Sequence, residues 1–203
     1  MAAKDLTASA NPVRVTKRRA ETRARLLQAA YRVFADQGFG RVRIEEVCTA
    51  AGYTRGAFYS QFESLDELFF TLYDEHAQLI AEQLTEALGN PGGDSTPEAA
   101  VNRIADTLFL DRDWLLIRSD FQLYAARNPA VAQRLTEHRA QLRNAIEELI
   151  TASGVQLPQS LRSAAEVARA VVATYDGIAT QLLLDDDLTA ARAQLRQMLT
   201  ALV

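Results

Sequence analysis

The sequence of 203 residues has one cysteine, five prolines and nine glycines, and it has no run of eighteen apolar residues. A single cysteine, Cys48, cannot form a disulfide within the chain, so a disulfide scaffold is excluded and a reducing compartment is indicated. The low content of glycine and proline disfavours an all-β fold. Because its first twenty residues lack an apolar signal core, we expect a soluble, cytoplasmic protein that does not enter a membrane.

The sequence also lacks a recognisable catalytic or metal-binding constellation. His76 and His138 are far apart and have no cysteine or histidine partners in metal-ligand spacing. No nucleophile with an adjacent base and no pair of carboxylates in an apolar setting is evident. The run 185–187, three aspartates, is suited to cap the helix that follows it. The sequence therefore predicts no enzyme activity, no catalytic residues, no metal and no cofactor.

Charge is unevenly distributed along the chain. The formal net charge is -4, yet residues 1–62 carry eleven Lys and Arg against five acidic residues, a net +6. The other 141 residues carry eleven against twenty-one, a net -10. A basic N-terminal part joined to an acidic remainder is the charge distribution expected of a domain that binds the phosphate backbone of nucleic acid. Basic segments also bind membranes or acidic proteins, so charge leaves a helical adaptor open as an alternative.

Helical periodicity dominates the remaining pattern, which predicts an all-α fold. Gly38 ends the first helix, and Gly and Pro between residues 89 and 97 mark a loop. We expect helices at 17–37, 44–51, 55–62, 65–88, 97–110, 112–126, 128–153, 161–184 and 188–202. This order predicts a disordered basic tail at 1–15, a unit of three helices at 16–64, and a longer helical unit at 65–203.

Two short helices around Gly52 predict a helix-turn-helix, whose second helix enters the major groove of DNA. Phe58 and Phe62, four residues apart, are expected to face the core. Polar and small residues are left for the groove: an arginine can bind guanine bidentately, and a glycine lets the backbone approach closely. The predicted DNA-binding residues are Arg43, Thr54, Arg55, Gly56, Tyr59, Ser60 and Gln61.

The segments "TRARLLQAAYRVFADQGF" (22–39) and "IEEVCTAAGYTRGAFYSQFESLDELF" (44–69) closely resemble the N-terminal domain of the tetracycline-repressor (TetR) family of bacterial transcription regulators. Three positions depart from the family pattern. Arg43 stands where Ser or Thr usually caps the second helix, Gln61 replaces a common His, and Leu65 replaces a Lys that contacts phosphate. These changes bear on the operator sequence and on the salt dependence of binding.

The resemblance implies a DNA-binding domain at 16–64 that binds a double-stranded DNA operator. It also implies a ligand-binding and dimerisation domain at 65–203, which forms a homodimer through its last two helices and binds a partly apolar small-molecule effector among the others. The segment 111–129 offers four candidate effector contacts: Trp114, Arg118, Phe121 and Tyr124. The broad apolar faces of the last two helices suggest dimer contacts at Val167, Val171, Tyr175, Ile178, Leu182, Leu195 and Met198. An effector is expected to shift the fourth helix, which carries Leu68 and Leu72 beneath the DNA-binding domain, and so to release the operator.

The main alternative to this repressor hypothesis is an all-α small-molecule carrier or enzyme without sequence-specific DNA binding. Turnover of a compound by the purified protein would favour it. The adaptor alternative would instead show vesicle binding and indifference to duplex sequence.

Overall fold

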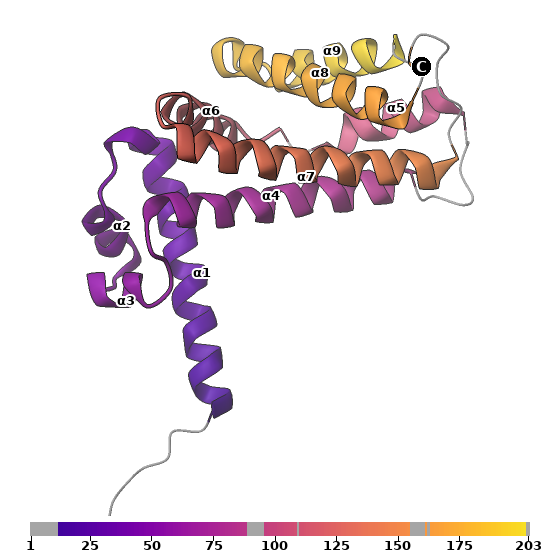
Figure 1. The fold of residues 1–203 in the computed structure, drawn as a ribbon. Coiled ribbons are helices and arrows are strands. Elements are labelled where there is room, and N and C mark those ends of the chain that lie inside the picture. Colours follow the sequence, from indigo (N-terminus) through magenta and orange to yellow (C-terminus); the bar gives the residue numbers. More distant parts are fainter. Residues whose placement is uncertain (1–11, 89–95, 109, 155–160, 162, 202–203) are drawn as a thin grey trace, which may run out of the picture.

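The computed structural model describes residues 12–88, 96–108, 110–154, 161 and 163–201, and the regular structure in these ranges is entirely helical (Figure 1). Helices α1, α2 and α3 form a head at one end of a layered bundle made by the remaining helices. The predicted all-α class is confirmed. Most of the tail predicted at 1–15 lies outside the described residues, while residues 12–15 form the first turn of α1.

The head consists of α1 (Pro12–Gln37), the 3₁₀ turn η1 (Phe39–Arg41), α2 (Ile44–Ala51) and α3 (Arg55–Tyr59). Helix α1 begins five residues before the predicted start, at a proline whose fixed φ suits the first helical position. Helix α3 ends three residues before its predicted end. There the Ser60 hydroxyl donates to the Ala57 carbonyl at 2.7 Å, a local bond that competes with continued helix.

The body consists of α4 (Leu65–Leu88), α5 (Pro97–Thr107), α6 (Arg112–Ala126), α7 (Pro129–Ser153), α8 (Ala164–Asp185) and α9 (Leu188–Thr200). Side-chain caps start four of these helices: the oxygens of Ser64, Thr96, Asp111 and Ser163 each accept a backbone N–H three residues on. Asp187 caps α9 in the same way, as the run of aspartates predicts.

Two hydrophobic clusters hold the molecule together. The first joins the head to the body: it contains Phe34 and Phe58 of the head together with Phe69 of α4 and Phe121 of α6. The second lies farther along the body, among α4 to α9, around fully buried Leu115 and Leu195. Because the first cluster is continuous across the junction, head and body are not separated by a flexible linker.

A glycine marks the closest approach at this junction. Gly38 follows α1 with φ +83°, a conformation that favours glycine, and a Cβ built there would lie 2.7 Å from Oδ2 of Asp120 in α6. The backbone conformation at Gly38 therefore disfavours a side chain, and a Cβ there would also require the Asp120 carboxylate to shift. Helices α1 and α6 pack directly against each other.

Candidate functional site

The turn between α2 and α3 has the geometry expected of a helix-turn-helix. Gly52 ends α2 in the left-handed region at φ 72°. Thr54 is extended, and its hydroxyl accepts the Ala57 N–H at 3.3 Å, which caps α3. These two residues turn the chain sharply, and α3 lies beside α2 at the outer edge of the head (Figure 1).

Helix α3 has one buried face and one open face. Phe58 is 0% exposed and Phe62, just beyond the helix, is 1% exposed; both belong to the first cluster, as predicted. Six of the seven predicted DNA-binding residues are exposed and the seventh, Gln61, is half-buried. A Cβ on Gly56 would contact only the Thr54 hydroxyl, at 3.8 Å, so the fold itself leaves open space there.

Arg55 is the most prominent cation on this open face. Its guanidinium lies 2.9 Å from the Glu45 carboxylate of α2 and 3.4 Å from the Tyr59 hydroxyl. Both partners are on the surface, where such an ion pair is worth little. Arg55 is therefore held in an extended position at modest cost and can exchange Glu45 for a base edge or a phosphate.

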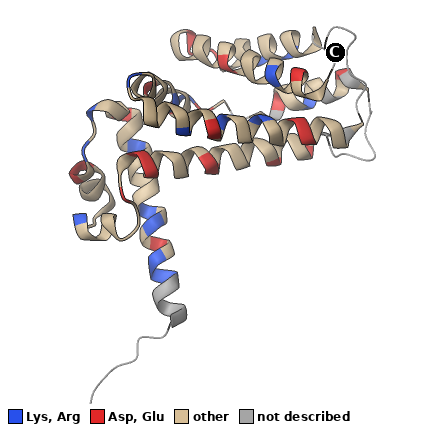
Figure 2. Cartoon of the chain, in the orientation of Figure 1, with Lys and Arg blue, Asp and Glu red and all other residues tan. Residues whose placement is uncertain are grey.

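Arg43 starts α2 without a side-chain cap. The backbone N–H of Arg43 donates to Glu46 Oε2 at 2.7 Å. This is the half of a capping box in which the side chain of the third helical residue accepts from the N-cap backbone. The Arg43 side chain is exposed, as are those of Lys17, Arg18 and Arg19, and Figure 2 shows several Lys and Arg residues along α1. Positive charge thus gathers on the head, while acidic residues predominate on the body.

The sequence assigned no role to Arg23 of α1. In the structure it links Gln61, just after α3, to Thr71 of α4. Its guanidinium donates to the Gln61 carbonyl and to the Thr71 hydroxyl, each at 3.1 Å, and it lies 4.4 Å from the centre of the Phe62 ring. Arg23 is among the positions that match the family, but only the fold brings residues 61 and 71 to it.

Replacing Arg23 with methionine is expected to lower the free energy of unfolding by about 1.5–3 kcal/mol, because it removes charge-assisted hydrogen bonds that are partly buried. Denaturant unfolding measures this change. Arg25→Met is the matched control, since Arg25 makes only an exposed ion pair with Glu21 and should cost less than about 1 kcal/mol. Equal losses in the two variants would contradict the assigned role.

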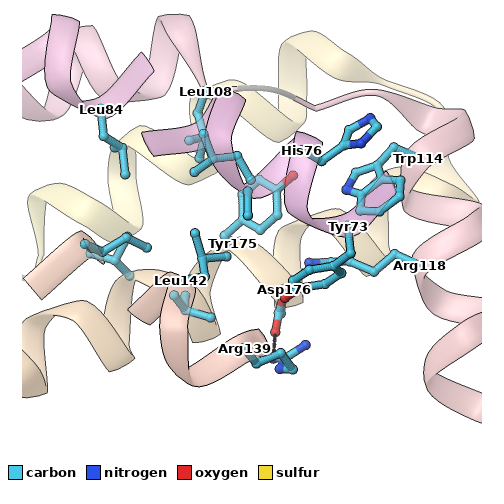
Figure 3. Close-up of a pocket in the computed structure, with 15 residues that line it drawn as sticks. Tyr73, His76, Leu84, Leu108, Trp114, Arg118, Arg139, Leu142, Tyr175 and Asp176 are labelled. Atoms are coloured by element: carbon cyan, nitrogen blue, oxygen red, sulfur yellow. Dashed lines mark hydrogen bonds and ion pairs between the residues drawn. The ribbon is translucent and has the colours of Figure 1, made fainter. Parts of the chain in front are cut away.

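A second feature is a cavity in the body, between α4, α6, α7 and α8 (Figure 3). Its enclosed volume is about 40 Å³, room for a few water molecules, and it has an open mouth, so an organic ligand enters it only when lining side chains move apart. The side chains that line it are largely apolar, with a few polar groups: Tyr73, His76, Ala77, Ile80, Leu84, Leu108, Trp114, Arg118, Arg139, Leu142, Ile146, Val171, Val172, Tyr175 and Asp176.

Two of the four predicted effector contacts, Trp114 and Arg118, line this cavity. The other two do not. Phe121 stacks on Phe69 with ring centroids 3.5 Å apart, and Tyr124 packs on Phe39 at 5.1 Å, so both fill the junction between head and body. Trp114, Arg118 and Phe121 share one face of α6, but Phe121 lies two turns beyond Trp114, where this face packs on Phe69 instead of lining the cavity.

The polar groups of the cavity form an ion-pair cluster that the sequence did not suggest. Asp176 lies between two arginines, 2.7 Å from Arg118 and 2.5 Å from Arg139. Arg118 is 9% exposed, and its Nε is a buried side-chain nitrogen without a hydrogen-bond partner among the described residues. A lone Asp within the apolar run "VVATYDGIA" was the available signal that α8 holds something polar.

The remaining titratable groups in the cavity are held neutral. Burial raises the pKa of Tyr175 to about 12, and burial also raises the pKa of Tyr73 against the opposing effect of Arg139 and Arg118. Burial lowers the pKa of His76, although its bond to the Leu72 carbonyl at 2.8 Å and the nearby Asp111 favour the charged form.

His76 also joins the cavity to the head through stacked rings. Its imidazole lies 3.9 Å from the Trp114 ring at an interplanar angle of 8°, and Tyr31 of α1 stacks on its other side at 5.7 Å and 3°. The Tyr31 hydroxyl donates to Asp111, the residue that caps α6. Three helices, α1, α4 and α6, therefore meet at this stack.

The lowered pKa of His76 predicts a pH dependence of stability. The unfolded chain binds a proton at this group near pH 6.5 and the folded chain does so only at lower pH, so stability is lost as pH falls below about 6.5. The loss is at most about 1.4 kcal/mol per pH unit. His76→Phe should lack this component when unfolding is compared between pH 7.5 and 5.5; parallel pH curves for the two proteins would refute the assignment.

The proposed dimer contacts lie mainly inside one chain. Five of them (Val167, Tyr175, Ile178, Leu182 and Leu195) are buried with 0–7% exposure, and Val171 lines the cavity. Met198 alone among the seven is open, at 49%. The apolar face of α8 is broad because it closes both the second cluster and the cavity within one chain.

The described part of the chain contains no group of three or more His, Cys, Asp or Glu side chains placed to hold a metal ion. Nor does any helix in the described ranges have the length and apolar character needed to cross a membrane.

The fold and the open face of α3 define a helix-turn-helix protein with a helical body, and comparison with known proteins agrees. Residues 26–72 match the family described as bacterial regulatory proteins, tetR family, and residues 95–203 match the tetracyclin repressor-like C-terminal domain. The chain belongs to the TetR family. This is a family of transcription regulators, so the prediction that the chain is not an enzyme is confirmed.

Individual relatives cover part of the chain. The regulator AcrR of Shigella flexneri is 32% identical over 112 residues, 53% of this chain and 52% of AcrR. The repressor AcnR of Corynebacterium efficiens is 27% identical over 126 residues, 62% of each chain. The chain thus spans between half and two thirds of the length of these curated relatives.

Solved structures match over most of the chain. A transcriptional regulator from Saccharomonospora viridis in complex with choline superposes with a TM-score of 0.66 at 19% identity, over 90% of this chain and 95% of that one. This likeness shows a shared fold.

Proposed function

We propose that this chain is a ligand-responsive repressor that binds a pseudo-palindromic DNA operator as a homodimer in the cytoplasm. The observation that supports this most is the division of α3: Phe58 is fully buried, while Arg55 and Tyr59 stand on an open, positively charged face. A helix of this kind reads base edges in the major groove when it is presented by a helix-turn-helix. Arg43, Thr54, Arg55, Gly56, Tyr59, Ser60 and Gln61 are the proposed contacts.

Selection from a library of random duplexes tests this proposal. We expect enrichment of an inverted repeat with half-sites about one helical turn apart, and an affinity that falls steeply with salt because phosphates release counterions. Salt-independent binding without sequence preference would count against a specific regulator.

We also propose that the exposed face of α8 and α9 forms the homodimer. Leu184 is 85% exposed, and Leu188 and Met198 are 44% and 49% exposed. Gly177, in the middle of α8, is exposed, and a Cβ there would meet nothing within 4 Å, so this chain alone gives no steric reason for a glycine that weakens the helix. Close approach of a second copy supplies one.

The dimer proposal predicts that Met198→Glu shifts the protein toward monomer in analytical ultracentrifugation, because a charge would be buried in the interface. Thr200→Glu, on the exposed end of the same helix, is the control. If Met198→Glu remained a dimer, the interface would have to lie on another surface. If the unmodified protein were a monomer, the dimer proposal would be wrong.

We propose further that a small effector occupies the cavity and releases the operator. Helix α4 carries Leu68 and Leu72 in the junction cluster and Tyr73, Ile80 and Leu84 on the cavity wall. A ligand that moves this wall therefore moves the support of the head, and differential affinity for two head positions becomes differential affinity for DNA. On this basis residues 16–64 act as the DNA-binding domain and residues 65–203 as the ligand-binding and dimerisation domain.

Fluorescence anisotropy of a labelled operator, titrated with protein in the presence of candidate effectors, tests this coupling. Ligands that bind tightly in the cavity yet leave operator affinity unchanged would reject it.

A further inference from the structure

The cavity has two chemically distinct ends. At one end Arg118, Arg139 and Asp176 come together from α6, α7 and α8, bordered by Tyr73 and Trp114 (Figure 3). The other side of the cavity carries aliphatic side chains from α4, α7 and the end of α5, among them Leu84, Leu142 and Leu108. A ligand that fills this space needs a polar group at one end and an apolar body at the other.

The charged end has one cation more than it has anions. Asp176 is the only carboxylate among the described residues that line the cavity, and two guanidiniums share it. The other titratable lining groups, His76, Tyr73 and Tyr175, are neutral near pH 7. Just outside the lining, Asp111 raises the pKa of Tyr175, and Arg143 acts on the pKa of Tyr73 in the opposite direction. The wall therefore presents a net charge of +1 in a largely apolar setting.

An uncompensated buried cation favours an anionic ligand. Arg118 also has a buried Nε without an acceptor among the described residues, which adds unused donor capacity. A cationic ligand such as the choline bound by the Saccharomonospora viridis protein can be held by aromatic rings, but here it would lie beside two arginines whose charge Asp176 neutralises only in part. Charge therefore separates the possible ligand classes.

We propose that the effector of this protein is an organic monocarboxylate with an aliphatic body, whose carboxylate binds Arg139 while its body lies among the leucine, isoleucine and valine side chains of the cavity. This inference rests on the proposed role of the cavity as the effector site. Arg139 is the more accessible of the two arginines, because its side chain is 25% exposed, against 11% for Arg118. Asp176 then keeps Arg118, and the cluster becomes neutral.

The chain carries its own reporter for this test, since its single tryptophan, Trp114, lines the cavity. Three probes with the same ten-carbon chain separate charge from apolar contact: decanoate, 1-decanol and decyltrimethylammonium, each titrated below its aggregation threshold. Decanoate is expected to change the Trp114 emission saturably, with an affinity at least about tenfold above that of decanol, because it gains a charge-assisted hydrogen bond. Decyltrimethylammonium is expected to bind weaker than decanol.

Variants assign the contact to Arg139. Arg139→Gln should lower decanoate affinity about tenfold or more and leave decanol affinity unchanged. Arg134→Gln, on the same helix but stacked on Phe70 outside the cavity, is the control and should bind decanoate normally. Asp176→Asn should act in the opposite direction and strengthen decanoate binding, since it removes the competing carboxylate. Thermal unfolding of each variant verifies that it is folded.

The outcomes separate this inference from the proposed function. Absence of a saturable decanoate response, equal affinity for the three probes, or unchanged decanoate binding by Arg139→Gln would overturn the monocarboxylate assignment. Tight decanoate binding that depends on Arg139 supports the monocarboxylate assignment. If decanoate binds in this way but leaves operator affinity unchanged, the proposed regulation through the cavity is wrong and the assigned ligand class is retained. Operator release by the decyl cation alone would keep regulation by the cavity and overturn the anionic ligand class.

Discussion

Replacing Arg55 with alanine is expected to weaken operator binding by roughly 1–3 kcal/mol for each half-site and to relax the preference at one base pair in each. Arg55 is the exposed cation of α3, and its partner Glu45 lies 2.9 Å away on the surface. Because an exposed ion pair contributes little free energy, Arg55 can leave Glu45 for a guanine edge at small cost. Anisotropy titrations with the selected operator and with its single-base variants measure both the loss and the change in preference.

Arg112→Ala is a matched control for this experiment. Arg112 is also an exposed arginine with an exposed carboxylate partner, Asp186 at 3.3 Å, but it lies on the body. Its replacement should leave operator affinity within a factor of about two, because only distant, screened electrostatics change. If Arg55→Ala lowered affinity uniformly for all base variants, Arg55 would be a phosphate contact and base reading would belong to another residue.

The largest expected loss of stability follows replacement of Phe121 with alanine, at about 3–5 kcal/mol in the free energy of unfolding. Phe121 is fully buried, stacks on Phe69, and meets Phe39 edge to face at 4.7 Å. Removing it leaves a void between α6, α4 and the turn after α1, where the surrounding rings cannot easily collapse. Denaturant unfolding followed by circular dichroism gives the free energy.

Leu123→Ala serves as the control, because Leu123 lies on the same helix and is 58% exposed. It should change stability by less than about 0.5 kcal/mol. A small effect of Phe121→Ala, together with a lowered affinity for cavity ligands, would instead return Phe121 to the effector site that the sequence suggested.

The sequence predicted the head well because its signals are local. Apolar spacing over 44–51, the glycine after it and the threonine that caps α3 each act within a few residues, and the structure reproduces all three. The same holds for α6, whose predicted bounds of 112–126 agree with the structure. Phe58 and Phe62 were correctly expected in the core because a spacing of four residues fixes a common direction.

Local signals failed where several helices meet. The cavity draws on four helices separated by up to a hundred residues, and its Arg139 and Asp176 come together only through the packing of α7 on α8. An apolar pattern says that a side chain avoids water, but not whether it meets its own chain, a ligand or a second copy. That is why Phe121 was expected in the cavity and Leu195 at the dimer interface, whereas both are fully buried in the clusters.

Helix α1 is continuous, so a rotation at the junction between head and body moves its far end by a larger distance. From Phe34, in the junction cluster, to Pro12 the helix extends away from the body over about 33 Å at 1.5 Å per residue. A swing of only about 6° around the junction carries the far end through roughly 3.4 Å, the rise of one base pair. The Asp120 carboxylate lies close to Gly38 at this junction. If the body binds an effector as we propose, a small angular change in it displaces the start of α1 relative to DNA by a distance comparable to one base pair.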